Sequence, residues 1–330
     1  MTNLKSVPPY RHPGSINFKS GPYEAWKALG GGTARPFFPP RLLHALAYRC
    51  EWPELWRTRG EAQLMFVEPV SVRFDTFPYY LTHEVVPFIW DCWPSHYDRM
   101  ERWMRRHRVR CAIFTSRQEM EAMQQRLPEV QMLHCPEAVD TARYSAGKPL
   151  AARSIDLLEF GRSNAKVLGG MDMTGIRHVS TLQHGRYIFS NEALFQAMGN
   201  ARITLCLPRS VTHPELAEGV ETLTQRYWEA MLSGMLIVGH APQELVDIVG
   251  YNPVIELDAQ APARQIAQLL AHIADYQPMV DRNREVALAK GDWKQRISEL
   301  MHRLEALGWH CLANTVYDCL QNDATHKAEQ

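Results

Sequence analysis

Short apolar runs alternate with helix-like segments along most of the chain. Runs of strand length occur at 63–68, 83–90, 110–114, 131–135, 155–160, 178–183, 202–207, 235–239 and 253–257. They are continuous rather than alternating, which is typical of strands covered by helices on both faces. Between them, apolar periodicity predicts helices at 95–108, 117–126, 223–233, 261–275, 279–289 and 293–307. Alternation repeated this often predicts an α/β fold with doubly wound parallel sheets.

A segment without apolar periodicity separates two sets of predicted strands. Residues 141–153, TARYSAGKPLAAR, are rich in short side chains and contain both Gly and Pro, as connecting segments do. The length of 330 residues agrees with two domains of roughly 150 residues each. We therefore expect a first domain at 1–145 and a second at 146–310, with a last helix and a polar tail at 311–330.

Composition narrows the class of protein. The 36 Lys and Arg residues balance 36 Asp and Glu residues, which argues against a globally basic nucleic-acid-binding protein. The chain has 45% hydrophobic residues and nine Trp, which excludes a disordered chain. Its seven Cys residues are odd in number and form no C-x-x-C. This pattern predicts free thiols in a reducing, cytoplasmic compartment and no zinc site. Residues 1–15, MTNLKSVPPYRHPGS, do not have the apolar stretch expected of a signal peptide, and no apolar run in the sequence reaches membrane-spanning length.

The stretch at 202–244 is the richest in candidate chemistry. A predicted strand ends near Leu207, and a polar loop leads to a helix expected from about Leu223. Thr222 and Gln225 have the T-x-x-Q spacing of a capping box, and Gly234 ends the helix. A helix N-terminus delivered by a strand is a usual phosphate site in open α/β sheets, because free N–H groups and the helix dipole attract anions.

Two acidic residues flank this predicted helix start. Glu221 precedes it and Glu229 follows eight positions later, on the order of 12 Å along a helix axis. That distance is close to the span from a sugar to a ribose across a diphosphate, and carboxylates accept hydrogen bonds from hydroxyl groups. The alternative is two ordinary surface glutamates.

Three segments resemble a known family. Residues Glu221–Val238 contain E-x7-E-A-M-x-S-G-x-x-I-V, which resembles the donor-site motif of retaining GT-B glycosyltransferases of group 1 (family 4 and relatives, including the CgeB-like branch). Residues 153–166, RSIDLLEFGRSNAK, are similar to the strand and turn that open the nucleotide domain in that class. Residues 135–144, CPEAVDTARY, are similar to the crossing between its domains. Together the three segments cover roughly 135–250.

The resemblance implies a fold and an activity. The fold would be two Rossmann-like domains facing a central cleft, an acceptor domain and a donor domain, with a helix at 311–322 returning to the first. The activity would be transfer of a sugar from a nucleotide-diphospho-sugar to a hydroxyl of a glycan or lipid-linked acceptor, with retention and without cofactor or metal. The absence of any D-x-D in the sequence agrees with a site without metal. The implied role is bacterial surface or exopolysaccharide synthesis.

The resemblance also implies residue roles. Glu221 would contact the donor sugar, and Glu229 the ribose. Arg162 and Lys166 match the basic pair that neutralises the diphosphate; a surface salt bridge is the alternative for both. The remaining expected donor-site residues are Thr222, Leu223 and Thr224 beside the phosphates and His213 in the preceding loop, which is otherwise an ordinary loop residue.

The match departs from the family at two points. The glycines that usually follow the first Glu are absent, since Thr222, Leu223 and Thr224 stand there. Arg226 precedes Glu229 by three positions, as in the R-x-x-E of the CgeB-like branch. If this second alignment holds, Arg226 is the phosphate ligand and Glu221 is a coincidence.

The first half offers weaker candidates. Asp91 and His96 follow a predicted strand; Asp91 would be a base for an acceptor hydroxyl or the cap of the next helix, and His96 an ordinary surface residue. Gly30–Gly32 follow a helix-like segment, which argues against a dinucleotide site. Six Arg residues at 99–110 face a single Glu101. This basic helix would contact anionic lipid at the inner face of the plasma membrane or be a solvated face.

Two other functions stay open. One is a nucleotide-sugar epimerase on the same fold, which would use the same diphosphate site but need no acceptor. The other is a non-catalytic binding or scaffold subunit, which no nucleotide sugar would stabilise against heat.

Overall fold

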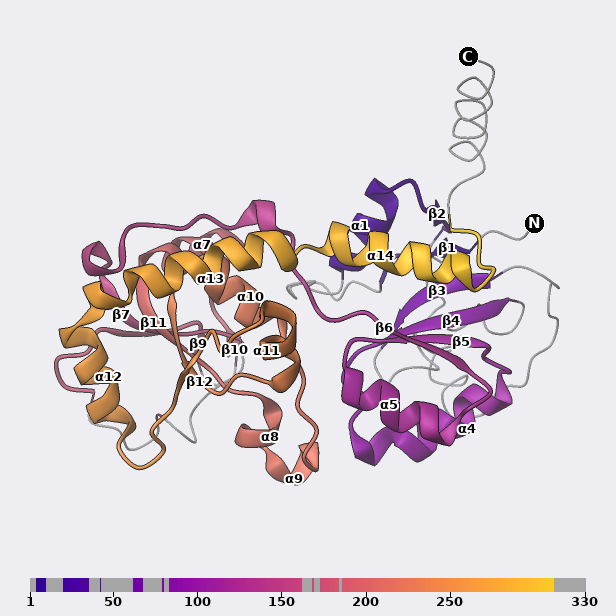
Figure 1. The fold of residues 1–330 in the computed structure, drawn as a ribbon, viewed down its shortest axis with the longest axis horizontal. Helices are drawn as coiled ribbons and strands as arrows, with labels where there is room; N and C mark the ends of the chain where they lie inside the picture. Colours follow the sequence, from indigo (N-terminus) through magenta and orange to yellow (C-terminus); the bar gives the residue numbers. More distant parts are fainter. Residues whose placement is uncertain are drawn as a thin grey trace, which may run out of the picture. The chain divides into compact units, whose positions relative to one another are not determined.

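The chain forms two compact units. The computed structural model describes residues 4–9, 20–35, 42, 62–67, 79, 83–161, 168, 173–183 and 186–311. Met1–Pro136 and Trp293–Gln330 make up the first unit, and Glu137–Asp292 make up the second. In Figure 1 the first unit accordingly carries both indigo and yellow segments from the two ends of the chain.

A parallel sheet forms the centre of the first unit. In the described residues its order is β2 (Gly32–Thr33), β1 (Lys5–Ser6), β3 (Ala62–Val67), β4 (Glu84–Ile89), β5 (Cys111–Phe114) and β6 (Gln131–His134). The predicted runs at 63–68, 83–90, 110–114 and 131–135 are therefore confirmed as strands.

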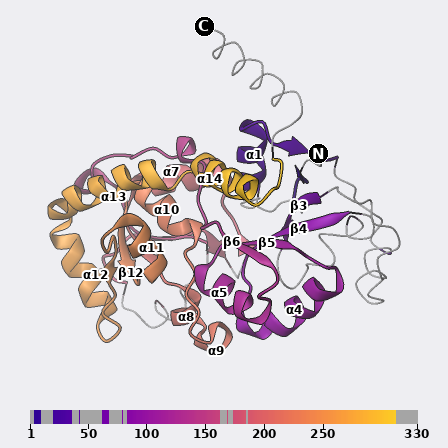
Figure 2. The same ribbon diagram turned by 45° about the vertical axis from the view of Figure 1, so that its right-hand side comes forward.

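Helices cover both faces of this sheet. On one face, α4 (Tyr97–Arg106) and α5 (Arg117–Arg126) pack Met100, Met104 and Met123 against β4 and β5. On the other face lie α1 (Ser20–Ala28) and α14 (Trp293–Ala306), which contact each other (Figures 1 and 2). The α14 residue Trp293 meets the rings of Phe88 and Trp90 edge-on, with centroids 6.5 and 6.3 Å apart.

Hydrogen bonds fasten the segment 293–311 to the first unit. The backbone carbonyls of His310 and Cys311 accept from Leu4 N at 2.7 Å and Gly32 N at 3.0 Å. Arg303 Nη1 donates to the His134 carbonyl at 2.8 Å. The sequence predicts domain boundaries after 145 and 310, whereas the contacts divide the chain after Pro136 and after Asp292. Apart from Cys311, the helix expected at 311–322 lies outside the described residues.

The second unit contains another parallel sheet. Its order in the described chain is β13 (Ile255–Glu256), β12 (Leu236–Gly239), β11 (Ala201–Cys206), β7 (Ile155–Glu159) and β8 (His178–Ser180). A separate antiparallel pair joins β9 (Leu182–Gln183) to β10 (Arg186–Tyr187). Because β8 lies on one side of β7 and β11 on the other, the strand order reverses between β7 and β11. Ligands bind at such a switch point, outside the carboxyl ends of the strands.

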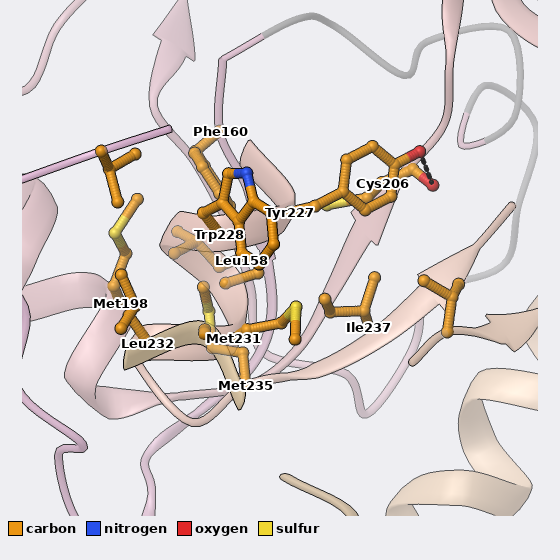
Figure 3. Close-up of a cluster of buried hydrophobic side chains, with 14 of the residues drawn as sticks. Leu158, Phe160, Met198, Cys206, Tyr227, Trp228, Met231, Leu232, Met235 and Ile237 are labelled. Atoms are coloured by element: carbon orange, nitrogen blue, oxygen red, sulfur yellow. Dashed lines mark hydrogen bonds between the residues drawn. The ribbon is translucent and has the colours of Figure 1, made fainter. Parts of the chain in front are cut away.

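A hydrophobic core lies on each face of this sheet. One contains side chains of α7 (Asn191–Asn200), α10 (Gln225–Leu232) and α11 (Gln243–Val249), and the other those of α12 (Pro262–Ala271). Helix α13 (Gln277–Lys290) contributes to both. Figure 3 shows Trp228 and Met231 of α10 within the first core. The predicted α/β fold with doubly wound parallel sheets is thus confirmed.

A buried guanidinium ties the second unit together at the start of β7. Arg153 is 2% exposed, and it donates to five backbone carbonyls: those of Ala146, Lys148, Met198, Ala201 and Ser233. Burial lowers the pKa of Arg153 to about 10, with Asp281 opposing the shift, so the group remains charged at neutral pH. At Gly234, which has φ 62°, a Cβ would lie 2.9 Å from Arg153 Nη2, so only glycine fits there.

Replacing Arg153 by Met is expected to lower the free energy of unfolding by about 3 kcal/mol or more, because several buried carbonyls lose their donor at once. Urea denaturation of the full chain measures the change. Arg264→Met, at an exposed position of α12, is the matched control and should stay within about 0.5 kcal/mol of wild type. Equal stability of the two variants would contradict the role assigned to Arg153.

Candidate functional site

The N-terminus of α10 lies at the switch point of the second sheet. The helix begins at Gln225, with Thr224 as N-cap and no capping hydrogen bond from its side chain. The capping box predicted for Thr222 and Gln225 is therefore wrong. A carboxylate from a distant segment lies there instead, since Gln225 N donates to Glu137 Oε2 at 3.1 Å. Thr222 and Leu223 precede the helix and are 5% and 1% exposed.

Arg226, in the first turn of α10, bridges the ends of β7 and β11. Its Nη2 donates to the carbonyl of Leu207, just beyond β11, at 3.1 Å. Its aliphatic part passes Gly161, just beyond β7, where a Cβ would lie 2.6 Å from Arg226 Cδ. Gly161 also has φ 75°, so both its conformation and its contact with Arg226 require glycine.

At the N-terminus of α10, two buried polar atoms have no hydrogen-bond partner within the described residues. Arg226 is 8% exposed. Neither its Nη1 nor the Thr224 hydroxyl has a hydrogen-bond partner among the described residues. Such atoms are rare in folded proteins and call for a specific explanation. A cationic donor at a helix N-terminus is suited to an anionic ligand.

Glu229 lies one turn further along α10. Its Oε1 accepts a hydrogen bond from the Tyr144 hydroxyl at 2.9 Å. Burial raises the pKa of Glu229, although the Tyr144 hydrogen bond and the charges of Arg226 and Arg143 oppose the shift. Tyr144 in turn packs edge-on against Phe195, with centroids 5.1 Å apart. A carboxylate is thus held, at a cost in desolvation, beside the buried guanidinium.

Glu221 lies outside the helix, so the spacing of about 12 Å along a helix axis does not apply. Its Oε1 accepts from Ser210 Oγ at 3.4 Å and lies 3.0 Å from His240 Nε2. His240 follows β12, and its Nδ1 lies 2.8 Å from Glu256 Oε1. His240 and Glu256 were not among the residues predicted from the sequence. A position directly after a predicted strand was the signal that could have identified His240.

Among the other predicted donor residues, only His213 lies within the described part of the chain. His213 joins two short helices, α8 (Arg209–Thr212) and α9 (Pro214–Ala217), and its Nδ1 lies 3.1 Å from Thr212 Oγ1. Arg162 and Lys166 lie outside the described residues. The structure therefore brings Glu221, Thr224, Arg226 and Glu229 to one edge of the second sheet.

In the first unit, Asp91 lies two residues beyond the end of β4 and has a φ of 54°, an uncommon backbone conformation that marks many functional positions. The alternative of Asp91 as a helix cap is wrong. The helical segment after it begins with a 3-10 turn at Pro94–His96, whose N-cap is Trp93, and the N-cap of α4 is His96. The buried Glu119 accepts a hydrogen bond from Cys92 N at 2.9 Å, which fixes the chain next to Asp91.

The arginines of α4 are partly paired. Arg105 contacts Glu101 at 3.2 Å and Glu129 at 2.5 Å, and the neighbouring Arg126 of α5 contacts Asp98 and Glu101. Arg102, Arg106 and Arg108 are exposed.

The described residues contain neither a membrane-spanning helix nor a cluster of metal ligands. None of the helices found there is long and apolar enough to cross a membrane. No group of three or more His, Cys, Asp or Glu side chains there is arranged to hold a metal ion.

The fold is similar to solved glycosyltransferase structures. A sucrose-phosphate synthase from Thermosynechococcus elongatus aligns with a TM-score of 0.60 at 13% identity, over 93% of this chain and 99% of that one. HepE of Anabaena, in complex with UDP-glucose, aligns with a TM-score of 0.61 at 9% identity, over 93% and 100%. A glycosyltransferase from Rickettsia africae gives 0.52 at 10% identity, over 93% and 98%. These similarities establish the GT-B fold, with two Rossmann-like domains. No protein-family model and no curated protein matches the sequence.

Replacing Glu229 by Gln is expected to leave the chain at least as stable as wild type near neutral pH. Because burial raises the pKa of Glu229, the folded chain binds this proton more tightly than the unfolded chain does. Wild-type stability therefore falls as the pH rises from about 4.3, the usual unfolded value, through the folded pKa, and Glu229→Gln lacks this fall. Urea denaturation across this pH range measures it. Glu285→Gln, at an exposed position of α13, is the control, and a loss of stability in Glu229→Gln at neutral pH would contradict the expectation.

Proposed function

We propose that the protein is a glycosyltransferase that takes a sugar from a nucleotide-diphospho-sugar and transfers it to a hydroxyl acceptor. The observation that carries the proposal is the buried Arg226 guanidinium, whose Nη1 lacks a partner among the described residues, at the switch point between β7 and β11. The GT-B fold supports the proposal, because the solved structures that resemble this chain are glycosyltransferases. A fold alone hosts many functions, so the proposed activity depends on the residues of the site.

The second unit would bind the donor along α10. Arg226 and the N-terminus of the helix would hold the diphosphate, because both offer N–H donors and positive potential. Glu229, beside Arg226, would accept hydrogen bonds from the ribose hydroxyls, with Tyr144 fixing its carboxylate at 2.9 Å. Glu221, on the loop before the helix, would contact the sugar. Thr222, Leu223, Thr224 and His213 would line the loop, and Arg162 and Lys166 would add positive charge to the phosphates.

The chemistry needs charge stabilisation above all. Cleavage of the bond between sugar and diphosphate leaves positive charge on the sugar ring and additional negative charge on the departing phosphate. Arg226 and the α10 N-terminus are fixed in place before the reaction, so they stabilise that negative charge without reorganisation. We propose that the reaction retains the anomeric configuration, as the E-x7-E resemblance implies, and proceeds without a metal, in agreement with the absence of a D-x-D in the sequence.

The first unit would bind the acceptor. Asp91, which has its unusual backbone conformation two residues beyond β4, would act as the base for the acceptor hydroxyl. The acceptor would be a glycan or a lipid-linked saccharide, in synthesis of a bacterial surface or exopolysaccharide. The exposed arginines of α4 would contact anionic lipid, with roughly 1 kcal/mol from each cation near the surface. In this proposal the enzyme works in the cytoplasm, at the inner face of the plasma membrane.

A thermal-shift screen with UDP-, GDP-, ADP- and TDP-sugars tests the donor class, with UDP-glucose first because HepE is described in complex with it. A donor at about 100 times its Kd should stabilise the protein by about 2.7 kcal/mol, which raises Tm by several degrees. No shift with any nucleotide sugar would favour a scaffold subunit. Conversion of the donor without an acceptor would favour an epimerase.

Replacement of the two glutamates should have different effects once a donor is known. Glu229→Ala is expected to weaken nucleotide binding about tenfold or more, because hydrogen bonds to a charged group are lost. Glu221→Ala is expected to lower kcat and to leave nucleotide binding nearly unchanged. Titration calorimetry with the nucleoside diphosphate and steady-state kinetics measure the two effects. Full activity of both variants, or crystal density for the donor away from the α10 N-terminus, would overturn the site assignment.

A further inference from the structure

His240 lies between two carboxylates at the carboxyl edge of the second sheet. Its Nε2 is 3.0 Å from Glu221 Oε1 and its Nδ1 is 2.8 Å from Glu256 Oε1. The three residues come from different elements: His240 follows β12, Glu256 ends β13, and Glu221 lies on the loop before α10. The pairing therefore depends on the tertiary fold and not on local sequence.

The main chain of His240 is fixed by the sheet and by α10. Its N–H donates to the Cys206 carbonyl at 3.1 Å, and its own carbonyl accepts from the Tyr227 hydroxyl at 2.6 Å. The preceding Gly239 has φ 153°, and a Cβ there would lie 1.9 Å from the Cys206 carbonyl oxygen. The close approach of the two strand ends thus requires glycine, and it fixes the backbone position from which the His240 side chain extends.

The two contacts require the charged form of the ring. A neutral imidazole has one donor nitrogen and one acceptor nitrogen, whereas an imidazolium has two donors. Both partners are carboxylate oxygens, so only the imidazolium donates to both. Partial burial lowers the pKa of His240, but the hydrogen bond that the ring donates to Glu256 and the charge of Glu221 outweigh it and raise the pKa above its usual value. In the described part of the chain, Glu221 and Glu256 are the charged groups that face the ring, and Ser210 of α8 approaches Glu221 from the other side.

We propose that His240 is a positioning residue for Glu221: as an imidazolium held by Glu256, it fixes the Glu221 carboxylate against the donor sugar, and loss of its proton releases that carboxylate. The inference rests on the proposed role of Glu221 in glycosyl transfer. It follows that turnover falls on the alkaline side, because the neutral ring presents a lone pair to one of the two carboxylates.

A purely structural role explains the arrangement less well. The side chains of His240, Glu221 and Glu256 are 35%, 25% and 61% exposed, and ion pairs this accessible contribute little to stability. Loss of the ring should therefore change thermal stability little and turnover more.

Two amide variants separate the two contacts. The Gln side chain in His240→Gln places its amide near the position of Nε2, so it can still donate to Glu221 but does not titrate. The shorter Asn side chain in His240→Asn reaches only the Nδ1 position, toward Glu256. We expect His240→Asn to lower kcat about tenfold with little change in donor KM. His240→Gln should restore much of kcat and should lack the alkaline fall shown by wild type.

The measurement is kcat and KM against pH for wild type and both variants, with Tm recorded for each. Equal kcat for His240→Gln and His240→Asn, or an alkaline fall that persists in His240→Gln, would overturn the proposal. Absence of transfer by wild type with every donor would instead overturn the proposed function.

Imidazole NMR gives a reading that does not depend on activity. Of the 14 His signals, the one missing in His240→Gln belongs to His240. In wild type it should titrate above about 6.5, the usual value for His, and at lower pH in Glu221→Gln and in Glu256→Gln. Titration at or below the usual value in wild type would overturn the pairing itself.

Discussion

The buried guanidinium of Arg153 determines where the candidate site lies. It binds the carbonyl of Ser233 at the end of α10, the carbonyl of Ala201 at the start of β11, and the connecting segment at Ala146 and Lys148. One end of α10 is thereby held at the amino edge of the sheet. A helix of eight residues is about 12 Å long, so its N-terminus necessarily projects at the carboxyl edge. That is where the strand order reverses and where Arg226 lies.

Two buried arginines of the second unit, Arg153 and Arg226, differ in how their hydrogen-bond donors are satisfied. Arg153 has backbone carbonyls on all sides and is satisfied within the fold. Arg226 is nearly as buried, yet within the described part of the chain its Nη2 donates to the Leu207 carbonyl while its Nη1 has no partner. The hydrogen bonds of Arg153 stabilise the unit. Arg226 instead keeps a charged donor available for a ligand, and burying that charge costs desolvation free energy. Glu229 adds to that cost, since burial also disfavours its charge.

Much of the fold could be predicted from local patterns in the sequence. Continuous apolar runs identified the long strands, and α5 begins and ends where its periodicity predicted, with Ser116 as its N-cap. Contacts between distant segments could not be predicted. The capping box at Thr222 failed because Glu137, far away in sequence, takes the first amide of α10. His240 was missed for the same reason: its significance comes from Glu221 and Glu256, which reach it only when β12 and β13 pair and the loop before α10 folds over them.

The first unit is assembled from both ends of the chain, and this has a consequence for biosynthesis. Helix α14, which covers one face of the first sheet with Trp293, leaves the ribosome only after the whole second unit has been made. Domains usually fold in the order in which they are synthesised. Here the second unit is contiguous and can complete its core first. The face of the first sheet that carries Phe88 of β4 remains uncovered until α14 has been synthesised. During translation that face stays exposed, as apolar surfaces prone to aggregation do in partly made proteins.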